Sequence, residues 1–284
     1  MGIALKSVGF SYLPGTPMAR EVLSSMDLEL EAGEITCLMG RTGAGKSTVL
    51  GIMCGLLEAT CGEVSLDGER LEGRAGMRAL KDAVGVVLQS SAQQLFADTV
   101  WKDVAFGPRN RGLSGEELSR RVQEALASVG MDPQTYSSRR PFSLSDGEMR
   151  RAAMAGVLAM RPRYLLMDEP SSGLDLPGRE QLYHTLEGLR ARGVGVLLVT
   201  HDWEEVELLA DRIAVLSAGR IALEGDKHTV LIAVEELESA GLRPPSLVAV
   251  LAELRRRGLD LPHCFPSPAE AAAIISKALE EVAG

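Results

Sequence analysis

The sequence predicts an α/β fold in which a mostly parallel sheet carries helices on its faces. Short runs of consecutive apolar residues are typical of strands that are buried on both faces, and helical segments lie between several of these runs. A glycine-rich loop also joins one of the runs to a helix. The 284 residues suffice for one large domain and a small appendage.

The first part of the chain contains a strand, a glycine loop and a helix in that order. Residues 3–8 alternate like a strand, and the apolar run 35–39 ends at Gly40. Residues 47–57 then indicate a helix, and residues 83–88 indicate a further buried strand.

Helices and buried strands alternate in the second part of the chain. The apolar runs 164–167 and 194–199 predict strands, whereas residues 116–129, 148–160 and 178–192 predict helices. This alternation favours parallel strands that are connected across the faces of one sheet.

The character of the chain changes after Gly225, so we place a domain boundary near residue 228. Residues 1–228 would form the α/β domain, and residues 229–284 a helical extension without a recognisable chemical motif. Three helices are expected in the extension, over residues 229–240, 246–257 and 268–282.

The composition argues against several classes of protein. The chain has 39 acidic and 30 basic residues, a formal net charge of −9, which argues against nucleic-acid binding through bulk positive charge. Aromatic residues make up only 4%, which is low for a platform that stacks single strands. No stretch approaches the ~20 apolar residues that span a bilayer, and no signal-peptide core opens the chain. We therefore expect a cytosolic protein; if it works at a membrane, something else must hold it there.

The cysteines show no CxxC spacing. Cys37 and Cys54 lie in apolar runs, which predicts buried, reduced thiols rather than metal ligands or a disulfide. The other two cysteines are Cys61 and Cys264.

A phosphate-binding loop is predicted at residues 40–48, which fit the pattern G-x-x-x-x-G-K-[ST] between a strand and a helix. Glycines let the backbone curl so that successive N–H groups point inward, and the following helix adds its positive end. We expect Lys46 to reach the β- and γ-phosphates of ATP, Ser47 to ligate Mg²⁺ and Thr48 to contact the α-phosphate. A glycine turn with a surface lysine is the structural alternative. The glycines of the loop are Gly40, Gly43 and Gly45.

Two adjacent carboxylates, Asp168 and Glu169, follow the apolar run 164–167. A carboxylate at the end of such a strand can hold Mg²⁺ through water, and a second one can orient or deprotonate an attacking water. We assign the first role to Asp168 and the second to Glu169. A strand that runs into a solvated acidic turn is the alternative.

Further motifs resemble those of ATP-binding cassette (ABC) ATPases. Residues 144–148 (LSDGE) resemble the LSGGQ signature of that family, and residues 171–175 (SSGLD) look like its D-loop. His201 resembles the switch histidine, Gln89 the glutamine of the Q-loop and Tyr12 the aromatic residue of the A-loop. The motifs occur in the family's order over residues 3–225. The resemblance implies a P-loop fold with a mostly parallel core sheet, an antiparallel β subdomain and a helical signature subdomain.

Other segments are similar to the ATPase subunits of energy-coupling factor (ECF) transporters, the cobalt-type importer group that takes up vitamins and transition-metal ions. These segments are residues 15–17 (GTP), 94–100 (QLFADTV), 103–108 (DVAFGP) and 149–160 (MRRAAMAGVLAM). The helical tail also suits this group, whose C-terminal extension helps to join two ATPase subunits.

The resemblance implies roles for several residues around ATP and Mg²⁺. Tyr12 would stack on adenine, Gln89 would touch Mg²⁺ or the attacking water, and His201 would hold the γ-phosphate and water in place. Asp175 would bond across a dimer, although it also suits the start of a helix. The signature would face the nucleotide of a second subunit through Ser145, Gly147 and Glu148.

The resemblance also implies partners. Two ATPase subunits, identical or different, would pack head to tail at the cytoplasmic face of the membrane. An integral membrane coupling subunit and a substrate-binding membrane subunit would complete the complex, with no nucleic acid. Residues 93–108 would form the groove for a helix of the membrane subunit, although core packing would account for about half of its apolar residues. These residues are Leu95, Phe96, Val100, Trp101 and Phe106.

Asp146 departs from the family's pattern, which usually has glycine there, and Glu148 stands where glutamine is usual. Asp146 could point away and cap the start of the helix. Alternatively, its charge would weaken the nucleotide site of the neighbouring subunit.

Two other functions compete with an ECF-type transport ATPase. One is the ATPase subunit of an ABC importer outside the ECF group. The other is a soluble ABC protein that acts on DNA or the ribosome. Such proteins usually carry tandem cassettes, coiled coils or basic insertions, which we do not find in this sequence.

Overall fold

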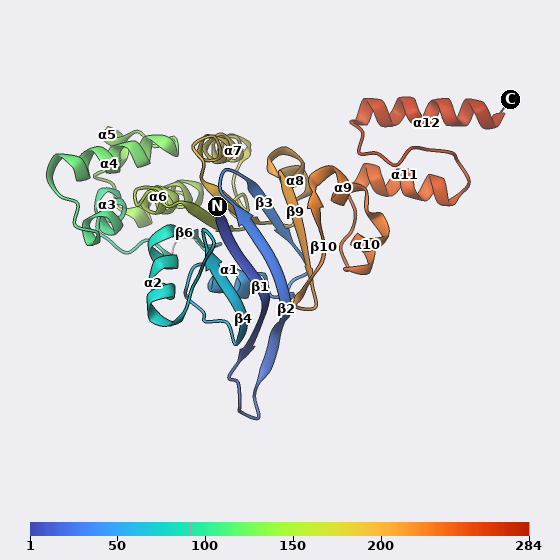
Figure 1. Cartoon of the computed structure of the whole chain (residues 1–284). Helices are drawn as coiled ribbons and strands as arrows, with labels where there is room; N and C mark the ends of the chain where they lie inside the picture. Colours follow the sequence, from blue (N-terminus) through green and yellow to red (C-terminus); the bar gives the residue numbers. More distant parts are fainter. Residues whose placement is uncertain (91–92, 284) are drawn as a thin grey trace.

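The structure, a computed structural model, describes residues 1–90 and 93–283, with side chains to residue 280, and confirms the predicted α/β fold (Figure 1). Its central sheet has the strand order β10-β9-β3-β8-β7-β6, and only β10 runs antiparallel to its neighbour. The bounds of these strands are β3 (Ile35–Met39), β6 (Val84–Val87), β7 (Tyr164–Asp168), β8 (Gly195–Val199), β9 (Arg212–Ser217) and β10 (Arg220–Asp226).

The central strands are continuous apolar runs because helices or a second sheet cover both of their faces. Every residue of β3 and β8 is buried, and the two strands pair in parallel with Cys37 opposite Leu198. The strands β3, β7 and β8 therefore end at the same edge of the sheet. The chain continues there into Gly40, Glu169 and Thr200, so that three predicted motifs lie close together.

A second, antiparallel sheet has the order β2-β1-β4-β5. Only its first strand was predicted from the sequence. In β2, Ser25 has a φ of 52° and the pairing with β1 shifts register near this point. The bounds are β1 (Gly2–Tyr12), β2 (Arg20–Glu31), β4 (Cys61–Leu66) and β5 (Glu69–Arg70). Side chains of this sheet, such as Leu30, share one apolar core with Val49 and Leu197.

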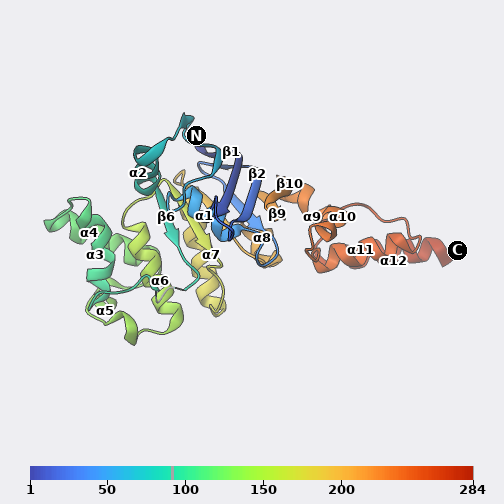
Figure 2. The ribbon, with the colours of Figure 1, turned by 90° about the horizontal axis from the view of Figure 1, so that it is seen from below.

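The helices form two groups. Those next to the sheets are α1 (Lys46–Met53), α2 (Gly73–Ala83), α7 (Leu176–Arg190) and α8 (Trp203–Leu209). The others form a helical subdomain on one side of the central sheet in both views (Figures 1 and 2), as the resemblance implied. They are α3 (Val100–Asn110), α4 (Gly115–Ser128), α5 (Pro133–Tyr136), the 3-10 helix η2 (Pro141–Ser143) and α6 (Asp146–Leu158).

The C-terminal part contains α9 (Lys227–Ile232), α10 (Val234–Ser239), α11 (Ser246–Arg256) and α12 (Pro268–Ala283). The single helix predicted over residues 229–240 is wrong, because Ala233 leaves the helical conformation at ψ 65°. This break lets Val230 and Leu237 both pack into the main core. Smaller apolar clusters join α10 to α11, through Val234 and Val248, and α11 to α12, through Leu251 and Ala278. The helices α11 and α12 extend away from the rest of the chain in both views (Figures 1 and 2). The boundary near residue 228 stays a prediction.

Within the described residues, none of the helices is both long and apolar enough to cross a bilayer. Cys37 and Cys54 are buried free thiols, as predicted, whereas Cys61 is exposed. Burial raises the pKa of the Cys37 thiol, which keeps it protonated and unreactive.

Candidate functional site

The loop between β3 and α1 has a backbone that side chains other than glycine could not adopt without strain. Gly40 has a φ of 154°, and a Cβ there would lie 2.4 Å from the carbonyl oxygen of Leu216. Gly45, at the start of α1, has a φ of 111°, and a Cβ there would lie 2.9 Å from Leu23. Gly43 also has a positive φ, 83°. The loop therefore keeps its amides accessible ahead of a helix start, as a phosphate-binding loop requires.

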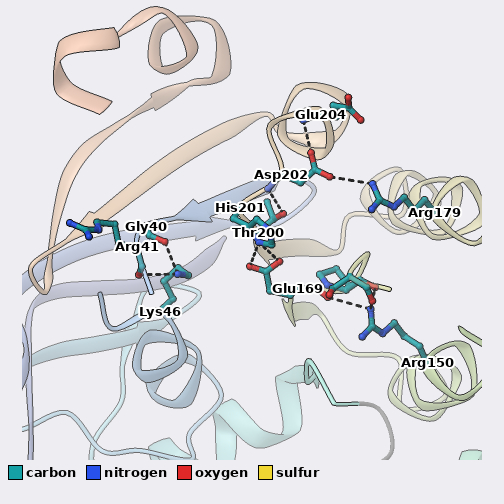
Figure 3. Close-up of polar contacts among 12 residues, drawn as sticks. Gly40, Arg41, Lys46, Arg150, Glu169, Arg179, Thr200, His201, Asp202 and Glu204 are labelled. Carbon is teal, nitrogen blue, oxygen red and sulfur yellow. Dashed lines mark hydrogen bonds and ion pairs between the residues drawn. The ribbon is translucent and has the colours of Figure 1, made fainter. Parts of the chain in front are cut away.

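Lys46 lies inside this loop (Figure 3). Its ammonium donates hydrogen bonds to the carbonyl oxygens of Gly40, at 2.7 Å, and Arg41, at 3.2 Å. Partial burial lowers the pKa of Lys46, and the carboxylates of Glu169 and Asp168 oppose that shift. A cation held between the loop and two carboxylates is placed to neutralise an anion that enters the loop.

The first residues of α1 meet two other predicted site residues. The hydroxyl of Ser47 lies 3.5 Å from the carboxylate of Asp168, at the end of β7. The phenol oxygen of Tyr12 lies 3.4 Å from the hydroxyl of Thr48, and the Tyr12 side chain is exposed. The structure thus brings Tyr12 and Asp168 to the start of α1, although both are far from that helix in the sequence.

Glu169 begins the loop after β7 in a left-handed backbone conformation, with a φ of 50°. This conformation costs a residue other than glycine roughly 1–2 kcal/mol. It is held by the amide of Glu169, which donates to the carbonyl oxygen of Val199 at 2.9 Å. The carboxylate of Glu169 lies 2.8 Å from Nδ1 of His201 (Figure 3). Glu169 therefore combines a strained backbone with a carboxylate that a histidine orients. Such a carboxylate is suited to act as a general base.

Asp168 differs from Glu169 in its electrostatic surroundings. Burial, and then the charge of Glu169, raise the pKa of Asp168, while Lys46 and the hydroxyl of Ser47 lower it. The two adjacent carboxylates repel each other unless a cation lies near them.

The oxygen donors at this edge of the sheet fit Mg²⁺. The hydroxyl of Ser47 and the carboxylate of Asp168 are hard ligands within reach of one ion, and Mg²⁺ usually takes one or two such protein ligands beside phosphates and water. Within residues 1–90 and 93–283, no group of three or more His, Cys, Asp or Glu side chains could hold a metal by itself. The side chain of Gln89 is exposed just after β6.

The signature residues lie at the start of α6. Ser145 caps the helix: its hydroxyl accepts a hydrogen bond from the amide of Glu148, and the Glu148 carboxylate accepts one from the amide of Ser145 at 2.8 Å. Glu148 also accepts a hydrogen bond from the hydroxyl of Tyr136 at 2.9 Å. The expectation that Asp146 caps this helix is wrong, because Asp146 is already helical and Ser145 has the extended backbone of a cap.

Asp146 instead lies beside a hollow of about 290 Å³. Gly147 of the signature and Gln89 also line this hollow, together with Ser172 and Gly173 of the predicted D-loop. The signature therefore lies near the Q-loop and D-loop of its own chain. Lys46 and the signature helix, marked by Arg150, lie on opposite sides of Glu169 (Figure 3).

The structural role of Arg150 was not predicted from the sequence. Its guanidinium connects several parts of the site (Figure 3). It donates to the carbonyl oxygens of Pro170 at 2.8 Å and of Gln89 at 2.9 Å, and also to those of Glu169 and Ser172. One side chain of α6 thus holds the loop after Glu169 and the segment after β6. Its partners are backbone atoms, so no pattern of residue types could have revealed the role.

Two further aspartates start helices at this edge. Asp175 caps α7 and accepts a hydrogen bond from the amide of Gly178 at 3.1 Å. Asp202, next to His201, caps α8 through the amide of Glu204 and pairs with Arg179 of α7 at 3.3 Å. These contacts fix the loops on both sides of the Glu169–His201 pair.

The apolar residues predicted to meet a membrane subunit divide into two sets. Leu95 and Val100 are buried, and Trp101 packs against the core. The side chains of Phe96 and Phe106 are 61% and 48% exposed, and their ring centroids lie 4.8 Å apart. Both rings line a groove of about 400 Å³ beside α3 and α6. The groove therefore offers an accessible aromatic pair above a packed core.

Comparisons with known proteins agree with this geometry. Residues 23–172 match the family model described as ABC transporter. The chain is 42% identical to the energy-coupling factor transporter ATP-binding protein EcfA2 of Symbiobacterium thermophilum, over 97% of this chain and 96% of that protein. It is 39% identical to the protein of the same name from Clostridium perfringens, over 92% of each chain.

Solved structures show the same fold. cbiO1 from Clostridium perfringens, part of the ABC transporter complex cbiONQ, has a TM-score of 0.74 and 30% identity, over 88% of this chain and 98% of that one. A dimeric ATP-binding cassette in a post-hydrolysis state, bound to ADP and Pi, has a TM-score of 0.71 and 29% identity, over 79% of this chain and 98% of that one. On its site geometry and these similarities, the chain belongs to the ABC transporter family, among the ATP-binding proteins of energy-coupling factor transporters.

Proposed function

We propose that this chain is the ATP-hydrolysing subunit of an ECF-type importer and couples hydrolysis to the uptake of a vitamin or a transition-metal ion. The observation that carries the proposal is the meeting of the glycine loop, Asp168 and the Glu169–His201 pair at one edge of the central sheet. The relatives named as ECF transporter ATP-binding proteins support the same activity.

Each residue of the site would have a separate role in ATP hydrolysis. The amides of the loop and Lys46 hold the phosphates, and Tyr12 offers an exposed ring beside Thr48 for the adenine. Mg²⁺, held by Ser47 and Asp168, would neutralise charge on the phosphates when bound. Glu169 takes a proton from water, whose oxygen attacks the γ-phosphorus, and the bond to the ADP oxygen breaks to leave ADP and phosphate. His201 keeps the carboxylate of Glu169 in position.

A second ATPase subunit would complete each site. The signature helix α6, which Ser145 caps, lies with its Arg150 on the other side of Glu169 from Lys46 (Figure 3), so within one chain its positive end would not serve the nucleotide of the same loop. Two subunits packed head to tail would bring each signature over the glycine loop of the other. A dimeric cassette with ADP and Pi among the similar structures supports this arrangement. The second subunit would be another copy of this chain or a similar ATPase.

The groove beside Phe96 and Phe106 would receive a helix of the membrane coupling subunit, which in turn would carry the substrate-binding membrane subunit. The chain would then lie at the cytoplasmic face of the membrane. cbiO1, which is part of the complex cbiONQ, supports such an assembly.

Purification in mild detergent tests the proposal. We expect the wild-type chain to retain an integral coupling subunit and a substrate-binding subunit, identified by mass spectrometry. Replacing Phe96 and Phe106 by serine should release both. Replacing Phe142, which is 66% exposed outside the groove, should not. Membrane subunits of a non-ECF importer, or no membrane subunit at all, would contradict the proposal.

A further inference from the structure

A second cavity, of about 390 Å³, lies at the opposite edge of the central sheet from the site above. It is lined by α4, by the turn between α6 and β7, and by the segment between α7 and β8. The cavity thus lies where β7 and β8 begin, whereas Glu169 and Thr200 follow the ends of these strands. Its volume is in the range of small-molecule sites.

Positive charge is concentrated in this cavity, although the chain has a net charge of −9. Arg121, Arg161 and Arg192 line it, and Glu124 is the one acidic residue among the lining residues that the structure describes. Glu124 is already shared, because it pairs with Arg161 at 3.0 Å and with Arg120 at 2.7 Å. Among the ion pairs of the described residues, the one other carboxylate that contacts these arginines belongs to Glu117, 3.6 Å from Arg121. Four arginines therefore face two glutamates, an excess of two positive charges.

Arg121 has a donor without a partner. Its side chain is 13% exposed, and one terminal nitrogen donates to the carbonyl oxygen of Ala159 at 3.3 Å. Its Nε is buried and makes no hydrogen bond. Burial, and then the charge of Arg161, lower the pKa of Arg121. An anion in the cavity would offset this crowding of positive charge around Arg121.

Arg161 is placed by an unfavourable backbone. It has a φ of 50° in the turn that ends α6, where its amide donates to the carbonyl oxygen of Leu158 at 2.9 Å. Glycine is the usual residue at such a position because it has no Cβ. The arginine keeps the strain, and its side chain lines the cavity.

The rest of the lining is largely apolar: Ala125, Leu158, Pro162, Leu189 and Val194. We propose that the cavity binds a phosphate monoester with an apolar body, with the phosphate among the three guanidiniums and the body against the apolar side chains. A dianion with three terminal oxygens matches both the excess of two positive charges and the number of donors better than a single carboxylate does. This inference does not depend on the transport function.

Calorimetric titration with phenyl phosphate tests the proposal. Saturating MgADP keeps the phosphate loop occupied, and low salt preserves the attraction between charges. We expect saturable binding to the wild-type protein, and a loss of affinity of at least about tenfold in the double variant Arg161→Gln/Arg192→Gln, which removes two charge-assisted contacts. The matched control is Arg74→Gln/Arg78→Gln on α2, two exposed arginines outside the cavity, which should bind like wild type.

The outcomes separate the possibilities. Equal affinity in wild type and the cavity variant, or no saturable binding by wild type, overturns the proposal. If the double variant does not fold, Arg192→Gln alone decides, because that exposed side chain donates only to the carbonyl oxygen of Gly188 among the described contacts. Vesicles with and without phosphatidic acid distinguish the source of the phosphate. Binding to the acidic vesicles that the cavity variant loses assigns a lipid headgroup, and phenyl phosphate binding alone assigns a soluble ligand.

Discussion

Glu169 has a strained backbone at the position where the reaction requires a precisely oriented carboxylate. Its left-handed conformation turns the chain out of β7, and the hydrogen bond with His201 fixes the side chain. The neighbouring Asp168, in ordinary strand conformation, faces Ser47. Adjacent carboxylates thus reach different partners, which separates the role of base from that of metal ligand.

The variant Glu169→Gln should keep the shape of the site but lose the base. We expect turnover of ATP to fall about 10²- to 10⁴-fold, the range that general-base catalysis contributes, while affinity for MgATP is retained. Steady-state phosphate release and equilibrium nucleotide binding measure the two quantities. Glu180→Gln, at an exposed position of α7, is the control. Unchanged turnover in Glu169→Gln would remove Glu169 from the reaction.

The protonation of Asp168 makes stability depend on pH. Because burial and Glu169 raise its folded pKa, the folded chain holds this proton more tightly than the unfolded chain. Stability is therefore lost as the pH rises from the ordinary carboxyl range through the folded pKa. Asp168→Asn should raise the melting temperature of the nucleotide-free protein at neutral pH and abolish Mg²⁺-dependent hydrolysis. Thermal unfolding across pH should show this gain shrinking toward about pH 4; a gain that does not change with pH would contradict the assignment.

At the scale of elements, α6 links the signature to the catalytic loops of the same chain. Ser145 caps this helix, and Gly147 lies in its first turn. Arg150, further along the same helix, donates hydrogen bonds to the backbone carbonyl oxygens of Glu169 and Gln89. A shift of the helix therefore moves the loop that carries the base. This link offers a physical route from the helical subdomain to hydrolysis.

Arg150→Gln should lower turnover about tenfold or more and leave the affinity for ATP close to that of wild type, because the phosphate loop is untouched. Arg150→Lys should recover little, since one ammonium cannot reach the same set of carbonyl oxygens. Separate measurement of kcat and KM, with the exposed Arg140→Gln as control, distinguishes loop positioning from a loss of ATP binding. An increase in KM with unchanged kcat would contradict this role.

The elements also show which features a sequence predicts. The uninterrupted apolar runs of β3 and β8 and the long helix α11 were predicted within a residue or two, because burial on both faces or a helical period marks them locally. The strands β2, β9 and β10 were not predicted. Register shifts interrupt the pairing of β2 and of β10, although residues 26–31 of β2 alternate regularly between buried and exposed side chains. The break at Ala233 lets α9 and α10 both pack against β10, a tertiary contact that the helical pattern of residues 229–240 does not show.

The same distinction holds for the site. The glycine loop and the acidic pair have local sequence patterns that are typical of phosphate and metal binding, so the sequence alone predicted them as site residues. The Glu169–His201 contact joins residues 32 positions apart, and the contacts of Arg150 end on backbone oxygens. Both depend on the order of strands in the sheet, which the local sequence does not encode.

At the scale of the whole molecule, the two edges of the central sheet carry different chemistry. The groups proposed to act in hydrolysis gather where the parallel strands end, and the arginine cavity lies where β7 and β8 begin. The end of α6 contributes to both the cavity and the groove beside Phe96, since Leu158 lines the first and Val157 the second. In the proposed assembly, each subunit would present half of a nucleotide site and a groove, and the arginine-lined cavity would lie apart from both.

Crosslinking of the Glu169→Gln variant tests most directly whether two such subunits close around ATP. The variant would be purified together with its membrane partners and treated with and without saturating MgATP. The account predicts a covalent pair of ATPase subunits that forms only with MgATP and is lost when Lys46→Ala is added. Single ATPase subunits under all three conditions would contradict it.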